Sequence, residues 1–316
     1  MSQAAHTDAE QAAVQAPVKR SSRWKEWSGI LKRDKRPLVG IVILLLFMLS
    51  AAFAPLLTPY NPSATQFTPL AAPSWHHWLG TTASGQDVWS QFLYGGRISL
   101  SVGFFAGFIA TALAVILGML PSYLGGWIDT TMATFTNIML VIPGLPLLIV
   151  ITAYVHQTGP VTIALVIGLT GWAWGARILR SQTLSLSRRD FVIASRLSGE
   201  TQWRVLTGEI LPNMLSLVVA NLVFATIAAI LAEASLEFLG LGNPSVVTWG
   251  TMLYWADTGQ ALLNGAWWWI VPPGLAIALV GLSLSLINFG VDQVSNPRLR
   301  LNKVKAARKP RKGAPS

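Results

Sequence analysis

The chain has 316 residues, of which 52% are hydrophobic and only 11% are charged, and its mean hydropathy is +0.50. Soluble domains carry about 25% charged residues, so this composition excludes an ordinary soluble domain and indicates a membrane protein. Cysteine is absent, which excludes a disulfide framework, a thiolate metal site and a cysteine nucleophile. The sequence also lacks the G-x-x-x-x-G-K-[ST] phosphate loop, so if ATP drives this protein, another polypeptide binds the ATP.

The net charge of +10 has an uneven distribution along the chain. The lysines and arginines cluster in Lys19–Arg36, Arg177–Arg204 and Arg298–Lys312, which leaves only Arg97 outside a cluster. A basic chain can indicate a nucleic-acid-binding patch, but confinement of the charge to two chain ends and one loop is typical of the positive-inside rule. We therefore expect both termini and the central basic loop to be cytoplasmic.

In chain order, we expect a basic cytoplasmic extension over residues 1–37, an extracytoplasmic segment over 58–96, a five-helix core over 97–296 and a basic cytoplasmic tail over 297–316. The first apolar run is about 20 residues long with no small-residue cleavage site after it, so it is interpreted as a transmembrane helix and not as a signal peptide. The predicted fold is an all-α membrane protein with six transmembrane helices. The predicted spans are Leu38–Leu57, Ile98–Leu120, Thr130–Val155, Pro160–Leu179, Met214–Leu236 and Trp267–Phe289.

Ionisable residues inside membrane spans usually mark proton relays and ion-coupled sites. No predicted span carries Lys or His at mid-membrane, and Asp129, Glu233 and Glu237 fall near predicted span ends. This pattern argues against a proton-driven transporter but leaves open a sodium site built from carbonyls and hydroxyls. On the second span Gly103, Gly107, Thr111 and Gly118 recur at near-helical spacing, which indicates close helix packing more than contact with a solute.

The longest polar interval of the second half is Arg189–Pro212. We predict two short helices there, Asp190–Leu197 and Thr201–Glu209, with Asp190 and Thr201 as their caps, a break at Ser198–Gly199, and an end before Pro212. On the first helix Phe191, Ala194, Ser195 and Ser198 share one narrow stripe of mainly small residues, which would let another surface approach closely. From periodicity alone an ordinary amphipathic loop helix remains an alternative.

The order of residues in this interval adds a resemblance. Asp190, Ala194-Ser195, Gly199 and Ile210-Leu211-Pro212 resemble the EAA loop of permease subunits of ATP-binding-cassette (ABC) importers, in the form found in the dipeptide/oligopeptide/nickel permease family. Ser195 stands where a second Ala is usual. In that family the loop is a coupling helix that docks in a cleft of the cytoplasmic ATPase. The resemblance implies ATPase-coupling roles for Asp190, Phe191, Ala194, Ser195, Leu197, Gly199, Glu200, Ile210 and Pro212.

Two further stretches resemble the same family. The stretch 76–100, HHWLGTTASGQDVWSQFLYGGRISL, is similar to the block that opens the second span of these permeases, although Thr82 replaces a usual Asp and Gln86 and Gln91 replace usual Arg residues. The stretch 233–253, EASLEFLGLGNPSVVTWGTML, resembles the EA-x-LSFLGLG signature, with Glu237 at a position usually held by Ser. In the family this second region meets the substrate-binding protein. The residues implied to lie on the extracytoplasmic, binding-protein-facing side are Gly80, Thr81, Asp87, Arg97, Leu239, Gly240, Gly242, Trp249 and Gly250.

Two charged or titratable features of the extracytoplasmic segment have alternative interpretations. Arg97 is interpreted as an interface anchor or as a partner of Asp87. The pair His76-His77 invites a metal interpretation, but adjacent imidazoles seldom chelate, no carboxylate or thiol is close in sequence, and the flanking Trp75 and Trp78 favour a membrane interface. We therefore expect no metal site.

The resemblance covers roughly residues 37–300 and implies a type I ABC importer permease, an inner-membrane protein of a prokaryote. It implies a second homologous permease subunit that completes the passage, two cytoplasmic ABC ATPases that bind ATP and Mg²⁺, and an extracytoplasmic substrate-binding protein. The chain itself would then have no catalytic residue and no bound cofactor or nucleic acid. Di- or oligopeptides are the expected substrate, with oligosaccharides or nickel as alternatives. From other classes, an ion-gradient-driven secondary transporter and a membrane scaffold remain as hypotheses.

Overall fold

The structure is a computed structural model that describes residues 35–155 and 159–295, with side chains described as far as Val291. The described residues form helices and loops without a β-strand, which confirms the predicted all-α class. Most of the predicted basic N-terminal extension and the whole C-terminal tail lie outside the described residues. Their predicted cytoplasmic location stays a prediction.

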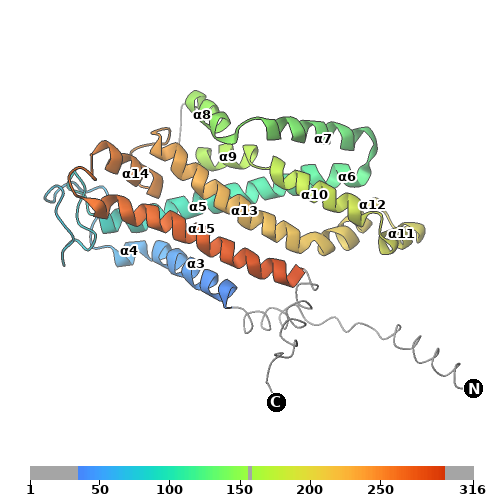
Figure 1. Ribbon diagram of the computed structural model, residues 1–316, viewed down its shortest axis with the longest axis horizontal. Coiled ribbons are helices and arrows are strands. Elements are labelled where there is room, and N and C mark those ends of the chain that lie inside the picture. The colour runs from blue at the N-terminus through green and yellow to red at the C-terminus, as the bar shows by residue number, and fades with distance from the viewer. Residues whose placement is uncertain (1–34, 156–158, 296–316) are drawn as a thin grey trace, which may run out of the picture.

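The described helices follow one another along the chain from α3 to α15 (Figure 1). Short π-helical turns join α5 to α6 and α12 to α13. The bounds are α3 Arg36–Ala52 with α4 Ala54–Leu57; α5 Val88–Ala114, η1 Val115–Met119 and α6 Leu120–Leu124; α7 Gly126–Val141 with α8 Gly144–Tyr154; α9 Pro160–Thr170 with α10 Ala173–Leu186; α11 Asp190–Leu197, α12 Gln202–Val205, η2 Leu206–Ile210 and α13 Leu211–Phe238; and α14 Trp249–Thr258 with α15 Trp267–Ser295.

The described residues contain four helical stretches that are long and apolar enough to cross a membrane, and five if the bent pair α7–α8 is counted as one span. The four stretches are Val88–Leu124, Pro160–Leu186, Gln202–Phe238 and Trp267–Val291. The predicted third span is therefore not one straight helix, since α7 and α8 meet at 87°. Pro143, which lies in an extended conformation between them, ends α7 because its ring cannot continue a helix.

The first predicted span is also shorter than expected. α3 has 17 residues and ends at Ala52, with Phe53 and Pro55 separating it from the short α4. About 20 residues are needed to cross a bilayer core, so α3 alone falls just below that length. The loop that precedes α5 covers residues 58–87, because α5 begins at Val88, so the predicted extracytoplasmic segment 58–96 includes the first turns of this helix and its location stays a prediction.

α5 and α13 pack along each other at the centre of the bundle, with α9 and α15 beside them, and α3 packs along α15. Small residues make the central contact possible. A Cβ on Gly107 would lie 2.5 Å from Thr226 Oγ1, and one on Gly118 would lie 2.5 Å from the Ala176 carbonyl oxygen. Thr111 Oγ1 accepts a hydrogen bond of 3.1 Å from Asn221 Nδ2 across the same interface. The predicted role of this stripe in close helix packing is confirmed.

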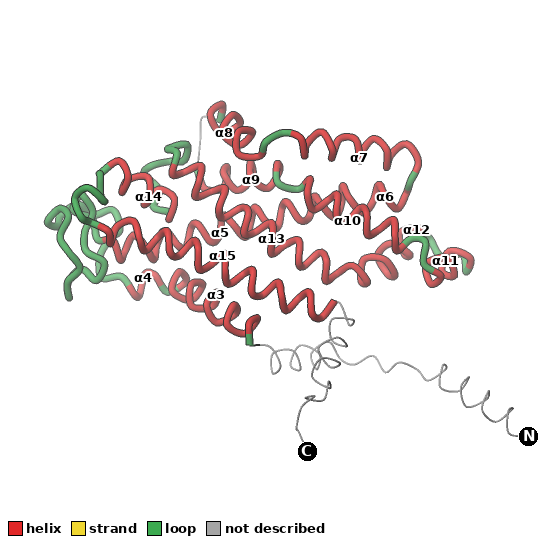
Figure 2. Tube along the Cα trace, in the orientation of Figure 1, coloured by secondary structure: helices red, strands yellow, loops and turns green. Residues whose placement is uncertain are grey.

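The bundle has two distinct ends (Figure 2). Residues 58–87, the loop before α14 and α14 itself gather at one end, which we call the loop end. α11 and α12 lie at the opposite end, which we call the α11 end. The N-terminus of α3 and the C-terminus of α15 point toward the α11 end (Figure 1), as the predicted topology requires of the chain ends.

Candidate functional site

The segment at the α11 end consists of α11, a turn and α12, which continues into α13. α11 spans Asp190–Leu197, as predicted, but Asp190 is its first helical residue and Arg189 occupies the N-cap without a side-chain hydrogen bond. The predicted capping role of Asp190 is therefore wrong. Its carboxylate instead lies in the first turn, where negative charge is favourable beside the positive end of the helix dipole.

The turn between the two helices contains Gly199 with φ +80°. This left-handed conformation is favourable only for glycine and tolerated by Asn and Asp, and it ends α11 at the predicted break. A Cβ at Gly199 would meet no atom within 4 Å, so the turn faces open space. Thr201 is the N-cap residue of α12 as predicted, although its side chain makes no capping hydrogen bond.

The predicted end before Pro212 is wrong. The helix passes without a break from η2 into α13, with Pro212 in the first turn of α13. Pro212 therefore lies inside a continuous helix, where a proline removes one backbone hydrogen bond and crowds the preceding turn, and the π-helical turn before it accommodates this change in hydrogen bonding. The segment is consequently joined to the central helix of the bundle as one continuous rod.

Internal contacts fix α11 to the rest of the bundle. Val192 is fully buried in the cluster that also contains Val205, Leu206 and Ile210. The Arg196 guanidinium lies 4.7 Å from the centre of the Tyr123 ring, a cation–π contact to α6. Ile210, a predicted coupling residue, is therefore part of the core and contributes no surface to a partner.

The segment exposes large apolar side chains. Leu197 is 83% exposed and Trp203 is 64% exposed, and Phe191 and Ile193 are exposed as well. We call these four residues the α11 patch. Asp190, Ala194, Gly199 and Pro212 are also exposed, while Ser195 and Glu200 are half-buried. Sequence reasoning missed Ile193 and Trp203, although the spacing of Ile193 and Leu197, one turn apart, was a signal that could have found the first.

A salt bridge braces the bundle next to this end. Arg180 on α10 donates two hydrogen bonds to the Asp129 carboxylate on α7, Nε to Oδ1 at 2.7 Å and Nη2 to Oδ2 at 2.8 Å. Such a bidentate arrangement is among the stronger ion pairs. It connects the otherwise exposed helix α7 to the span that leads into α11.

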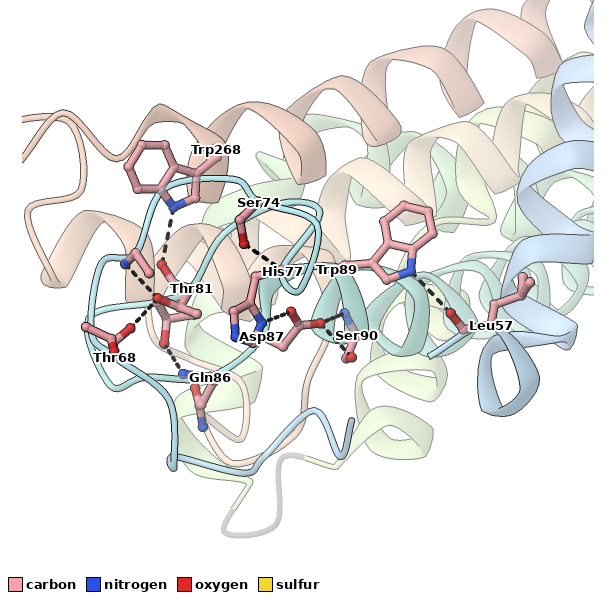
Figure 3. A network of polar contacts seen from close by, with 12 residues as sticks. Leu57, Thr68, Ser74, His77, Thr81, Gln86, Asp87, Trp89, Ser90 and Trp268 are labelled. Atoms are coloured by element: carbon pink, nitrogen blue, oxygen red, sulfur yellow. Dashed lines mark hydrogen bonds and ion pairs between the residues drawn. The ribbon is translucent and has the colours of Figure 1, made fainter. Parts of the chain in front are cut away.

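At the loop end, Asp87 organises the start of α5 (Figure 3). Its Oδ2 accepts hydrogen bonds from the Ser90 amide at 2.8 Å and the Ser90 hydroxyl at 2.7 Å, which caps the helix. Its Oδ1 lies 2.8 Å from His77 Nδ1. The predicted alternative of an Asp87–Arg97 pair is wrong, because Asp87 is buried and already bonded while Arg97 is exposed.

Thr81 connects the external segment to the last helix (Figure 3). Its hydroxyl donates to the Thr68 carbonyl at 2.6 Å and accepts from the Ala71 amide at 2.8 Å. Its carbonyl oxygen accepts from Trp268 Nε1 on α15 at 3.2 Å. Gly80, at φ +64°, passes so close to Trp268 that a Cβ would lie 2.7 Å from Nε1. These residues thus hold the loop against α15, and no local sequence signal indicated the contact.

The second external motif folds inward in the same way. The Trp249 amide donates to Ser99 Oγ at 3.1 Å and its indole Nε1 donates to the Phe92 carbonyl at 3.0 Å, so α14 is fastened to α5. Gly80, Thr81, Asp87, Gly242, Trp249 and Gly250 are buried. These six predicted binding-protein-facing residues consequently shape the fold, and only Arg97, Leu239 and Gly240 of the predicted set are exposed.

Comparison with known proteins agrees with this architecture. The family of binding-protein-dependent transport system inner membrane components matches residues 110–301, and the N-terminal transmembrane domain of oligopeptide transport permease C matches residues 22–73. The chain belongs to this permease family. It is a multi-pass protein of the bacterial inner membrane, and the resemblance inferred from its motifs is confirmed.

Among its relatives, the dipeptide transport system permease protein DppC of Alkalihalophilus pseudofirmus is 35% identical over 285 residues, which cover 88% of this chain and 91% of the relative. DppC of Bacillus subtilis is 34% identical, with 85% of this chain and 84% of the relative covered. The oligopeptide transport system permease protein OppC of Bacillus subtilis is 32% identical, with 88% and 91% covered.

Proposed function

We propose that this chain is a permease subunit that forms half of the passage of an ATP-driven, binding-protein-dependent importer for di- or oligopeptides. Peptide as the substrate is supported by the relatives, whose names refer to dipeptide and oligopeptide transport. Oligosaccharides and nickel, the alternatives within the same architecture, have no such support. The second half of the passage would come from a homologous permease chain.

The observation that carries the coupling part of this proposal is the α11 patch. Four large apolar side chains stand exposed on a segment whose inner side is anchored by Val192 and by the Arg196–Tyr123 contact. Large apolar side chains gathered on one exposed, firmly held segment are typical of a surface that another protein covers. Because the segment continues into α13, a push or pull on the patch would be transmitted along the central helix. An ABC ATPase docked there fits both features.

ATP and Mg²⁺ would be bound by the two ATPase partners, since this chain has no phosphate loop. An extracytoplasmic binding protein would deliver the peptide at the loop end, where Arg97, Leu239 and Gly240 remain exposed. Cycling between inward-open and outward-open states requires that the two differ by only a few kcal/mol. The role of this chain would be mechanical, with no covalent chemistry.

The proposal is tested by gentle affinity purification of the tagged chain from native membranes, with mass spectrometry of the proteins that accompany it. We expect a second permease, ATPases with phosphate loops and a binding protein. ATP-dependent uptake of labelled dipeptide by the reconstituted complex, unaffected by excess oligosaccharide or nickel, would support the peptide assignment. Recovery of the chain alone, under conditions that keep a related importer intact, would contradict the proposal and favour an ion-gradient-driven transporter.

A further inference from the structure

Two glutamates lie side by side in the last turns of α13, at the loop end of the bundle. Glu233 is 0% exposed and Glu237 is 3% exposed. They are four residues apart, so they project from the same face of the helix. Glu237 stands where the signature that this stretch resembles usually has Ser, so the second carboxyl group departs from that signature.

Hydroxyl groups of two neighbouring elements bond to the pair. Ser99 Oγ on α5 accepts a hydrogen bond from the Trp249 amide at 3.1 Å and donates one to Glu233 Oε1 at 3.0 Å. Thr248 Oγ1, at the N-cap of α14, accepts from the Thr251 amide at 3.0 Å and donates to Glu237 Oε2. Each carboxyl group is thus bonded to the element that covers it, Glu233 to α5 and Glu237 to α14.

One carboxyl oxygen of this site has no hydrogen-bond partner among the described residues. Glu233 Oε2 is buried and receives no hydrogen bond from any described donor. It belongs to a carboxyl group that projects from the same face of α13 as the Glu237 carboxyl group, one helical turn away, so the two groups can approach each other. Two ionised carboxylates are both acceptors and cannot bond to each other, whereas a pair that holds one proton can.

The described charged side chains on the surrounding elements do not neutralise the pair. On α5, Arg97 is exposed and Asp87 is bonded to His77 and Ser90, and on α14 Asp257 is exposed at the C-terminal end. α8, α9 and the described side chains of α15 include no charged residue. α10 carries Arg177 and Arg180 but meets α13 near Asn221, about three turns from Glu233. Two adjacent buried charges without a counter-charge would be very costly.

We propose that Glu233 and Glu237 form a proton-binding site that holds one shared proton between their carboxyl groups, and that this proton fastens α14 to α13 and α5. The proton supplies the missing donor for the unpaired oxygen and removes one of two adjacent charges. Loss of the proton would place two carboxylates in contact, and the repulsion would act on the two elements that they hold, α5 through Ser99 and α14 through Thr248. This inference does not depend on the substrate or partners of the importer.

The test uses the full complex in lipid nanodiscs and compares wild type with Glu237→Gln and Glu237→Ser. Gln supplies a permanent N–H donor in place of the shared proton, and Ser is the residue of the family signature. We expect the midpoint of thermal unfolding of wild type to fall by several degrees between about pH 6 and about pH 9, because the folded protein would hold a proton that an unfolded chain releases. In both variants the midpoint should change less over the same range, so that the difference from wild type reports this site alone.

Infrared spectroscopy gives a readout that does not depend on unfolding. At about pH 7, where an ordinary glutamate is ionised, wild type should show the carbonyl band of a protonated carboxylic acid, and Glu237→Gln combined with Glu233→Gln should lose it. Parallel pH profiles for wild type and both variants, or the absence of the band from wild type, would overturn the proposal. A rise of the wild-type midpoint with sodium at constant pH, lost in both variants, would also overturn it, because the site would then hold a metal cation instead of a proton.

Discussion

Leu197 provides the sharpest test of the α11 patch. Its side chain is 83% exposed, so the isolated permease gains little from it. Complete burial of a leucine side chain is worth about 1.5–3 kcal/mol, and the exposed part of Leu197 therefore offers about 1–2.5 kcal/mol to a partner that covers it. We expect Leu197→Ala to weaken binding of the purified ATPase subunits by roughly 5- to 60-fold, with the free energy of unfolding of the permease changed by less than about 0.5 kcal/mol.

The assay is a titration of fluorescently labelled ATPase subunits onto the permease in nanodiscs. Leu263→Ala is the matched control, because Leu263 is 84% exposed but lies in the turn between α14 and α15, at the loop end of the bundle. Leu197→Met, which keeps most of the apolar surface, should bind nearly as well as wild type. Equal affinities for Leu197→Ala, Leu263→Ala and wild type would refute the reasoning, since the patch would then remain uncovered in the complex.

Three further substitutions test the contacts described above. Gly199→Asp should lower uptake per ATP hydrolysed much more than Gly199→Asn, because both residues tolerate the left-handed turn and only Asp adds a charge beside the α11 patch. Equal uptake by both variants and wild type would mean that nothing docks on the α11 patch. Asp129→Asn should lower the free energy of unfolding by about 1–2 kcal/mol, between the values for exposed and buried ion pairs, because the amide keeps one acceptor for Arg180 but removes the charge. Asp129→Glu is the control that keeps the charge. Equal denaturation midpoints for Asp129→Asn and wild type would contradict the role of the salt bridge. Gly107→Ala should cost about 1–3 kcal/mol, because its Cβ would lie 2.5 Å from a hydroxyl oxygen on α13. Gly281→Ala, on α15, meets nothing within 4 Å and should be neutral or slightly stabilising, so similar thermal unfolding of the two alanine variants would show that α5 and α13 do not pack this closely.

The local helix signals were reliable where one short stretch contains all the relevant information. The bounds of α11 and the break at Gly199 were predicted because an apolar period and a glycine in a tight turn act on neighbouring residues. Cap assignments were less reliable, since Asp190 lies one residue inside the helix. Pro212 misled the prediction, because proline usually ends or kinks a helix, whereas here the π-helical turn before Pro212 lets the helix continue.

The candidate external residues illustrate the limit of motif reasoning. Gly80, Thr81, Asp87 and Trp249 were singled out by resemblance, but the resemblance does not separate residues that contact a partner from residues that hold a loop in place. Burial makes that distinction. It depends on side chains far apart in the sequence, such as Trp268, whose indole reaches the carbonyl of Thr81.

The sequence by itself determined the membrane class, the positions of the apolar helices, the bounds of α11 and the family, because each of these follows from composition, periodicity or a continuous string of residues. The tertiary structure alone decided that α7 and α8 meet at 87°, that Asp87 bonds to His77 and not to Arg97, and that Glu233 and Glu237 are buried against α5 and α14. Which groups form a hydrogen bond or an ion pair depends on three-dimensional packing. Hydrogen bonds and buried charges are satisfied by whichever groups the fold brings within about 3 Å, and distance along the chain carries no information about them.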